Sequence, residues 1–441
     1  MTTGNPGKLI LSFSIPVLIG NLVQQLYNMA DTIIVGQTLG SDALAAVGTT
    51  GPLCFLILGF VIGITGGIAV IAAQRFGAKD EAGLKKSVAM SIMLSIGLTV
   101  ILTLLSVLLA KPLLRMIHTP KEIMDDSYRY IVIIFIGIFA VVLYNMIACL
   151  LRALGDSKTP LYFLLISSIL NIGLDYVCIV TFDWGIAGAA WATVFSQLLS
   201  GILCLIYVKV KYPILHVKKS NFQWNPRFAW KHLAIGLPMA FQFSITAIGC
   251  LILQGALNLF GKDTIAAYAA ANKVEQLVTV PAGSFGVTMA NYSGQNLGAN
   301  RIDRIKEGVR KSGLITVAFS LGAMACVYLF SEPLLAMFNI QAATPIMSDA
   351  MFYLRLTAVF YPALFLIFIY RNVLQGIGRS FMPLMAGVFE LVARGIAAAI
   401  LPTMIGYAGV CLAGPLAWLA AAIPLAISYF VIIKKVERQY K

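Results

Sequence analysis

The chain has 441 residues, of which 59% are hydrophobic and only 11% are charged, and its mean hydropathy is +0.88. Soluble domains do not reach this composition, so we expect a polytopic membrane protein whose main partner is the lipid bilayer. The net charge of +14 does not indicate nucleic-acid binding, because the basic residues lie in short stretches between long apolar runs.

Twelve apolar runs are long enough to cross a bilayer, which takes about 20 helical residues. We therefore predict an all-α fold with transmembrane helices near residues 9–37, 47–74, 87–114, 129–151, 160–182, 186–208, 231–259, 265–293, 312–338, 350–374, 382–404 and 410–433. A proline inside a run removes a backbone hydrogen bond and can bend the helix. Such bends are expected at Pro16, Pro238, Pro281, Pro362 and Pro402.

The sequence contains a repeat at a shift of 221 residues. The segment Gln74-Arg75-Phe76-Gly77-Ala78-Lys79 returns as Gln295-Asn296-Leu297-Gly298-Ala299-Asn300, and Gly40 falls on Gly261. Near this shift, Pro16 falls on Pro238 and Gly155 on Gly378. Each half holds six runs, so both halves cross the membrane in the same direction. Duplicated membrane halves are typical of transporters.

The positions of the basic residues predict the orientation. When the runs are threaded alternately, the great majority of the 32 lysines and arginines fall on one side. That side is cytoplasmic by the positive-inside rule, and both termini lie on it. The longest polar connection, about residues 213–230, joins the halves there. We expect two pseudo-symmetric six-helix lobes, an N-lobe of residues 1–220 and a C-lobe of residues 221–441.

Two acidic residues of the first half lie deep inside apolar runs, where a charge costs about 2.5–3.5 kcal/mol. Counted along their helices, Asp31, Asp175 and Thr193 each lie about 10 Å below the outer surface. Asn171 precedes Asp175 by one helical turn and shares its face. If the three helices pack together, these four residues form an oxygen-rich site for Na+ or a proton.

Purely structural roles remain open for the same four residues. Asp31 can be a polar anchor near water, and Asn171 with Asp175 can form an interhelix hydrogen bond. Thr193 can bond to the backbone of its own helix.

The second half does not repeat this arrangement. At a shift of 222–223, Asn171 falls on Arg394 and Asp31 on Leu253. We expect Glu390 and Arg394, four residues apart, to form an ion pair within one helix, with a structural or gating role like that of Pro16. Polar residues that are candidates for a substrate cavity are Glu275, Gln242, Gln254, Asn258, Asn272 and Tyr27.

Other kinds of chemistry have little support. The seven cysteines lie scattered through apolar segments without a CxxC motif, as expected of packing residues. The three histidines show no metal-ligand spacing, and the sequence has no ATP-binding glycine-rich motif or cleavable signal peptide. We expect no enzyme activity, no cofactor, and no metal beyond a Na+ ion at Asp31, Asn171 and Asp175.

Six local motifs, in order along essentially the whole chain, resemble those of the multidrug and toxin extrusion (MATE) family of antiporters. They are Ile15-Pro16, Asn28-Met29-Ala30-Asp31-Thr32, Gln74-Arg75-Phe76-Gly77-Ala78, Arg152-Ala153-Leu154-Gly155-Asp156, Asn171-Ile172-Gly173-Leu174-Asp175 and Gly185-Ile186-Ala187-Gly188-Ala189-Ala190. The resemblance implies two six-helix lobes that form a V-shaped cavity in a monomer. It also implies a cation site at Asp31, Asn171, Asp175 and Thr193.

The predicted function is secondary active multidrug efflux, in which Na+ or H+ drives the export of amphipathic, mainly cationic organic compounds across the bacterial cytoplasmic (inner) membrane. The alternative is a flippase for a lipid-linked oligosaccharide or polysaccharide precursor. Such a flippase is expected to need several basic residues in its cavity, and the apolar runs contain few. A channel fits the duplicated chain less well, and a scaffold does not explain the buried acids.

Overall fold

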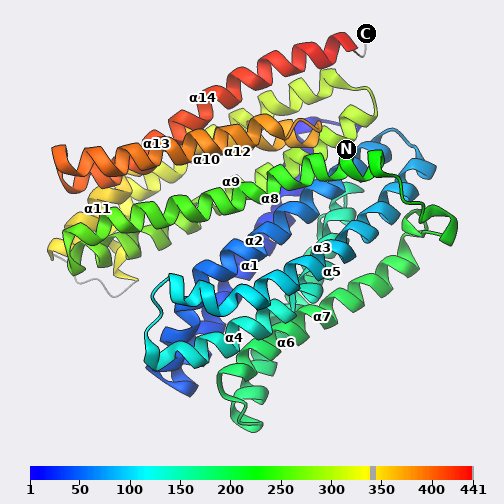
Figure 1. The fold of residues 1–441 in the computed structure, drawn as a ribbon. Coiled ribbons are helices and arrows are strands. Elements are labelled where there is room, and N and C mark those ends of the chain that lie inside the picture. Colours follow the sequence, from blue (N-terminus) through cyan, green and yellow to red (C-terminus); the bar gives the residue numbers. More distant parts are fainter. Residues whose placement is uncertain (338–343, 440–441) are drawn as a thin grey trace. The chain divides into compact units, whose positions relative to one another are not determined.

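The computed structural model describes residues 1–337 and 344–439, and these residues form helices without any β-strand (Figure 1). The predicted all-α membrane fold is confirmed. Residues 338–343 and 440–441 lie outside the described residues; they take in the last residue of the predicted run 312–338 and the end of the predicted C-lobe.

The long helices follow one another with short connections. They are α1 (Pro6–Leu39), α2 (Ser41–Gly77), α3 (Glu81–Met116), α4 (Met124–Ile136), α5 (Ile138–Ala153), α6 (Lys158–Tyr176), α7 (Gly185–Lys211), α8 (Pro226–Leu257), α9 (Lys262–Gly298), α10 (Ile302–Ala336), α11 (Pro345–Ala358), α12 (Tyr361–Gly376), α13 (Phe381–Ile405) and α14 (Tyr407–Gln439). Short helical turns are η1 (Lys121–Ile123), η2 (Val177–Thr181), η3 (Pro213–Leu215), η4 (Lys219–Asn221) and η5 (Asn258–Phe260).

Each of the twelve predicted runs falls on one of these helices or on a pair of them. Within the described residues, nine single helices are long and apolar enough to span a membrane, or eleven spans if two bent pairs count as one each. The remaining run is α9, which is 37 residues long but carries Lys273 and Glu275 among its polar residues. The polar content of α9 sets it apart from the other helices.

Two predicted runs are broken, and the expectation of one continuous helix for each of them is wrong. The residues of α4 and α5 meet at 43°, and those of α11 and α12 at 50°. The second break lies beside Pro362, which lacks an amide hydrogen for the preceding turn, so the bend expected there is confirmed. The first break lies at Gly137, where an added Cβ would come within 2.3 Å of Val194 Cγ2. A glycine therefore allows α7 to approach the break.

The chain folds into two compact units. The N-terminal unit comprises Ile15–Ser244, and the C-terminal unit comprises Met1–Ser14 with Ile245–Lys441. The boundaries fall inside α1 and α8, so each of these helices contributes to both units. In the C-terminal unit, Ser14 Oγ donates a hydrogen bond to Thr288 Oγ1 on α9 (2.8 Å). The lobes 1–220 and 221–441 follow from the repeat and stay a prediction.

Each unit has its own apolar core, and many large apolar side chains remain outside it. In the N-terminal unit α6 packs on α7, and in the C-terminal unit α13 packs on α14 (Figure 1). Leu108, Ile169 and Leu329 are 73%, 71% and 74% exposed. Water would make such surfaces unfavourable, whereas lipid tails solvate them, so the exposed apolar residues fit a membrane protein.

The internal repeat is visible in the backbone. Gly40 and Gly261, 221 residues apart, have φ angles of 88° and 86°. The non-glycine residues Lys79 and Asn300, at the same separation, both have φ of 57°. Matched left-handed residues at matched places show that corresponding turns of the two halves adopt the same conformation. The sequence repeat is therefore a structural repeat.

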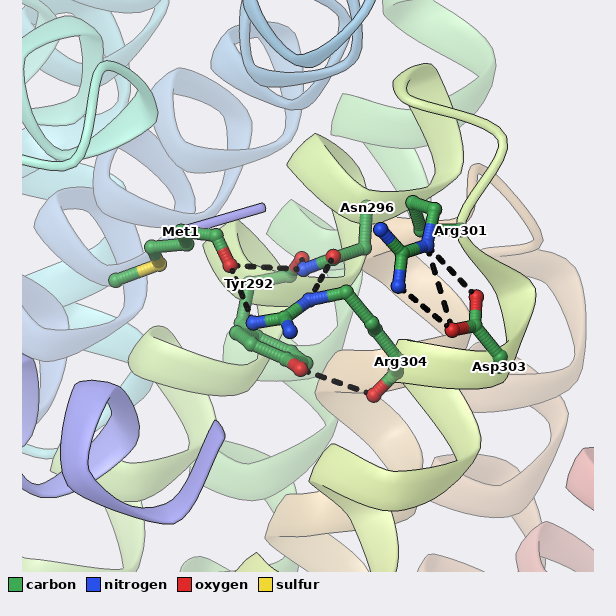
Figure 2. A network of polar contacts seen from close by, with 6 residues as sticks. All are labelled: Met1, Tyr292, Asn296, Arg301, Asp303 and Arg304. Carbon is green, nitrogen blue, oxygen red and sulfur yellow. Dashed lines mark hydrogen bonds and ion pairs between the residues drawn. The ribbon is translucent and has the colours of Figure 1, made fainter. Parts of the chain in front are cut away.

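The second copy of the repeated motif organises the turn between α9 and α10 (Figure 2). Arg304 Nε donates to Asn296 Oδ1 (3.1 Å), and Tyr292 Oη donates to the Arg304 carbonyl (2.9 Å). Arg304 Nη2 and Asn296 Nδ2 also donate to the Met1 carbonyl, at 3.3 and 3.5 Å. These bonds hold Met1 against α9 and α10 of the same C-terminal unit. Arg301 pairs with Asp303 at 2.9 Å.

Glycines allow close backbone contact inside the N-terminal unit. A Cβ on Gly67 of α2 would lie 2.4 Å from the Cα of Gly236 on α8. One on Gly63 would lie 2.6 Å from the Met239 carbonyl oxygen. Such contacts between small residues replace part of the hydrophobic driving force that is absent between helices in lipid.

We predict that Gly67→Ala lowers the melting temperature of the purified protein, because overpacking a close helix contact costs about 1–3 kcal/mol. The matched control is Gly48→Ala on the same helix, where an added Cβ meets nothing within 4 Å. The control should leave the melting temperature unchanged or raise it slightly. Equal melting temperatures for the two variants in detergent would show that the α2–α8 contact is not tight.

Candidate functional site

The four residues predicted to form a cation site come from three helices of the N-terminal unit. Asp31 lies on α1, Asn171 and Asp175 on α6, and Thr193 on α7. Asn171 Nδ2 donates to Thr193 Oγ1 at 3.4 Å, and the carboxyl groups of Asp31 and Asp175 lie close enough to interact electrostatically. The structure therefore brings the predicted residues together. Their role as a coupling site stays a prediction.

These side chains are deeply buried: Asp31 is 9% exposed, Asn171 1% and Asp175 0%. Two ionised carboxylates cannot hydrogen-bond each other, because neither has a hydrogen to donate. Asp31 Oδ1, Asn171 Oδ1 and both Asp175 carboxylate oxygens lack a hydrogen-bond partner. Within the described residues, neither aspartate forms an ion pair with a lysine or arginine.

Unpaired carboxylates in such surroundings are expensive, and the cost falls when a proton or a cation joins them. A proton would give one carboxyl group a hydrogen to donate to the other. Na+ would find carboxylate, amide and hydroxyl oxygens, which are the ligands that hard cations prefer. The residues present fit either ion.

The geometry also bears on the purely structural roles considered for these four residues. Thr193 Oγ1 does donate to the Ala189 carbonyl (3.2 Å), the backbone bond considered for it, while also accepting from Asn171. Asp31 is too buried to be a solvated helix-end anchor. A structural hydrogen bond explains Asn171, but it leaves the oxygens of Asp175 without a partner.

Two tyrosines complete the surroundings of the carboxylates. Tyr27, one turn before Asp31 on α1, lies beside Thr193 and close to both aspartates. The sequence placed Tyr27 among substrate-cavity candidates, whereas in the structure it lies beside the four residues of the predicted cation site. Tyr130 of α4 is 8% exposed and also lies near both acids. Sequence reasoning missed Tyr130, although the repeat aligns it with Tyr353 of the second half.

The remaining cavity candidates are distributed over both units. Gln242 lies buried in the N-terminal unit. In the C-terminal unit, Gln254 Nε2 donates to Asn258 Oδ1 (3.1 Å) near the end of α8, where both are exposed. Asn272 Nδ2 donates to Tyr268 Oη (3.3 Å) on α9. Of these candidates, the structure places Asn272 nearest to Glu275 along the same helix.

Glu275 is buried and accepts a hydrogen bond from Tyr353 Oη at 2.6 Å through Oε2, while its Oε1 has no partner. The Tyr353 ring packs edge-on against Tyr268, with centroids 5.0 Å apart. This bond joins α9 to α11, the first part of the broken run. Whether Glu275 contacts substrate stays a prediction.

An open cavity of about 890 Å³ lies elsewhere in the C-terminal unit, between α10 and α11. None of the predicted site residues lines it. Its lining residues are Tyr328, Glu332, Thr344, Pro345, Met347, Ser348, Met351, Phe352, Arg355 and Leu356.

The predicted ion pair on α13 is present, with Arg394 Nη2 2.8 Å from Glu390 Oε1. The structure adds a third member that the sequence did not reveal. Arg371 of α12 approaches Glu390 Oε2 at 3.2 Å, so the carboxylate bridges two arginines.

Comparison with known proteins identifies the family of the chain. The MatE family model matches residues 16–177 and, a second time, residues 238–400. The chain belongs to the MatE family. The resemblance drawn from the six motifs is confirmed, and the double match reproduces the internal repeat.

Known relatives of this MatE-family chain match three quarters of it or more. The probable multidrug resistance protein YoeA of Bacillus subtilis (strain 168) is 29% identical, over 75% of this chain and 73% of its own. An FAD transporter of Shewanella oneidensis is 25% identical, over 93% and 91%. A solved outward-facing multidrug resistance MATE transporter superposes with a TM-score of 0.92 at 26% identity, over 98% of this chain and 97% of that one. The family and its relatives are transporters.

We predict that the double variant Asp31→Asn/Asp175→Asn melts several degrees higher than wild type in neutral, Na+-free buffer. The substitutions remove two buried, unpaired carboxylates, and functional sites often cost stability in this way. Lower pH or added Na+ should stabilise wild type and leave the double variant unchanged. A double variant that melts lower than wild type under all conditions would contradict the site described here.

Proposed function

We propose that this MatE-family protein is a secondary active antiporter that exports amphipathic, mainly cationic organic compounds and is driven by inward Na+ or H+. The observation that carries the proposal is the pair of buried carboxylates, Asp31 and Asp175, whose oxygens lack partners beside Asn171 and Thr193. Coupling requires that the ion bind one conformation more tightly than another, and a pair of buried carboxylates contributed by separate helices meets this requirement when those helices move.

In the proposed cycle, the ion reaches Asp31 and Asp175 from outside and neutralises them. The neutral site favours closer packing of α1, α6 and α7, with bending of α1 near Pro16, and substrate leaves. The ion is then released to the cytoplasm and substrate reloads. An ion drives the cycle only if it binds one conformation more tightly than the other. The membrane potential supplies about 2.3 kcal/mol per charge per 100 mV.

The proposal includes the setting of the protein. We place it as a monomer in the bacterial cytoplasmic membrane with both termini in the cytoplasm. The concentration of basic residues on that side supports the orientation. The exposed apolar side chains of the helices support residence in the membrane.

Ethidium efflux from drug-sensitive cells tests the proposal. Cells that express wild type should export the dye, and Asp31→Asn or Asp175→Asn should reduce export to the level of cells without the protein. Each substitution removes a charge that the ion must neutralise. Replacing Na+ by choline in the medium identifies the ion, because only Na+ coupling fails in choline.

The matched control for these variants is Asp42→Asn, an exposed acid at the start of α2. It should export like wild type. Normal export by both site variants at normal expression would show that the buried acids are structural. Absence of export by well-expressed wild type would instead favour the flippase alternative.

The substrate class needs its own test, because one relative is named an FAD transporter and FAD is anionic. In inside-out vesicles, we predict that excess FAD leaves ethidium transport unchanged, whereas a second lipophilic cation such as tetraphenylphosphonium inhibits it. Buried acids attract cations and repel a dinucleotide phosphate. Inhibition by FAD alone would overturn the cationic substrate class while leaving ion coupling intact.

A further inference from the structure

The C-terminal unit contains a buried charged cluster that the proposed cycle does not use. Glu390 lies between two arginines, Arg394 at 2.8 Å and Arg371 at 3.2 Å. The three side chains are only 16%, 10% and 14% exposed, respectively. Buried charges at such cost are retained where they have a role or where neighbours fix them.

The repeat relates this cluster to the cation site of the N-terminal unit. The double match of the family model sets the shift at 222 residues at its start and 223 at its end. At these shifts the cation-site residues Tyr27, Asp31, Asn171 and Asp175 correspond to Gly249, Leu253, Arg394 and Ala398. The second half has therefore lost both acids and gained a guanidinium at the corresponding place.

Gly249 leaves the space that the Arg394 guanidinium occupies. A Cβ on Gly249 would lie 2.9 Å from Arg394 Nη1, so the guanidinium occupies the space next to that backbone. The corresponding residue of the first half is Tyr27, whose side chain lies beside the aspartates. Relative to the first half, the second half thus has glycine in place of tyrosine on α8 and arginine in place of asparagine on α13.

The cluster balances its own charge. Glu275 lies within electrostatic reach of Arg394, and Cys250 of α8 lies near Arg394, Glu390 and Glu275 together. The two guanidinium groups pair with Glu390, and Arg394 also acts electrostatically on Glu275, so the charges of the cluster sum to zero. The cation site of the N-terminal unit, by contrast, has two carboxylates and no basic partner among the described residues.

We propose that Arg394 is a tethered cation, which permanently fills in the C-terminal unit the place that the coupling ion occupies in the N-terminal unit. The C-terminal unit therefore exchanges no ion, and coupling runs through Asp31 and Asp175 alone. Removal of the guanidinium should expose a latent site for Na+ or a proton between Glu390 and Glu275. This inference rests on the proposed function, because it assumes that the N-terminal site binds the coupling ion.

The test is thermal melting of purified protein with Na+ or N-methylglucamine, each at neutral and mildly acidic pH. The parent is Asp31→Asn/Asp175→Asn, which removes the N-terminal site. Adding Arg394→Gln to this parent should create a rise in melting temperature with Na+ or acid that the parent lacks. Adding Glu275→Gln as well should abolish that rise. Arg394→Lys, which keeps a cation, should behave like the parent.

Several titratable or charged groups surround the Arg394 guanidinium. These groups are Glu390, Arg371, Glu275, Cys250, Tyr268 and Tyr353. Phenols keep their proton between neutral and mildly acidic pH. A response that depends on Glu275→Gln therefore reports the latent carboxylate site.

Two outcomes overturn the inference. In the first, the folded Arg394→Gln variant shows no rise in melting temperature with Na+ or acid beyond that of the parent. In the second, the rise occurs but persists when Glu275→Gln is added. Either result would show that Arg394 is only a structural member of the ion pair. If Arg394→Gln does not fold, Gly249→Ala in the same parent displaces the guanidinium instead and should produce the gain. Its control, Gly255→Ala on the same helix, has nothing within 4 Å and should not.

Failure of the proposed function gives a different result. In that case wild type and the parent respond equally to Na+ and acid. The rise in melting temperature from Arg394→Gln is measured relative to the parent. It therefore does not depend on the comparison between wild type and the parent.

Discussion

The two aspartates buried in the N-terminal unit impose the constraint on which the rest of this protein depends. Among the described residues, Asp31 and Asp175 approach each other in surroundings that supply neither a basic side chain nor enough hydrogen-bond donors. The surrounding helices must supply the stability to hold this unfavourable arrangement. In the function proposed here, an ion that relieves this cost gains binding free energy from the protein itself.

Gene duplication gave both halves the same helices but not the same charges. The matched left-handed residues at Lys79 and Asn300 show how closely the backbone was kept. The buried polar residues were not kept, because Arg394 stands where the first half has Asn171. The duplicated halves thus differ in their buried charges: two unpaired aspartates in the first half, and a carboxylate paired with two arginines in the second.

Much of the fold and the core of the site could be predicted, because lipid imposes simple rules. Apolar length located the spans, and depth counting brought Asp31, Asp175 and Thr193 to one level. The break at Gly137 was not predictable, since no proline marks it and its cause is Val194 on another helix. Tyr130 and Arg371 were missed because their partners lie on other helices, and only packing brings them together.

The passage of α1 and α8 across the unit boundary has a consequence for biogenesis. Met1–Ser14 belong to the C-terminal unit, although the ribosome makes them before any residue of the N-terminal unit. They can reach their partners, such as Thr288 and Asn296, only after more than half of the chain has entered the membrane. The C-terminal unit therefore contains residues made both before and after the N-terminal unit, so it cannot assemble fully until synthesis has passed through that unit.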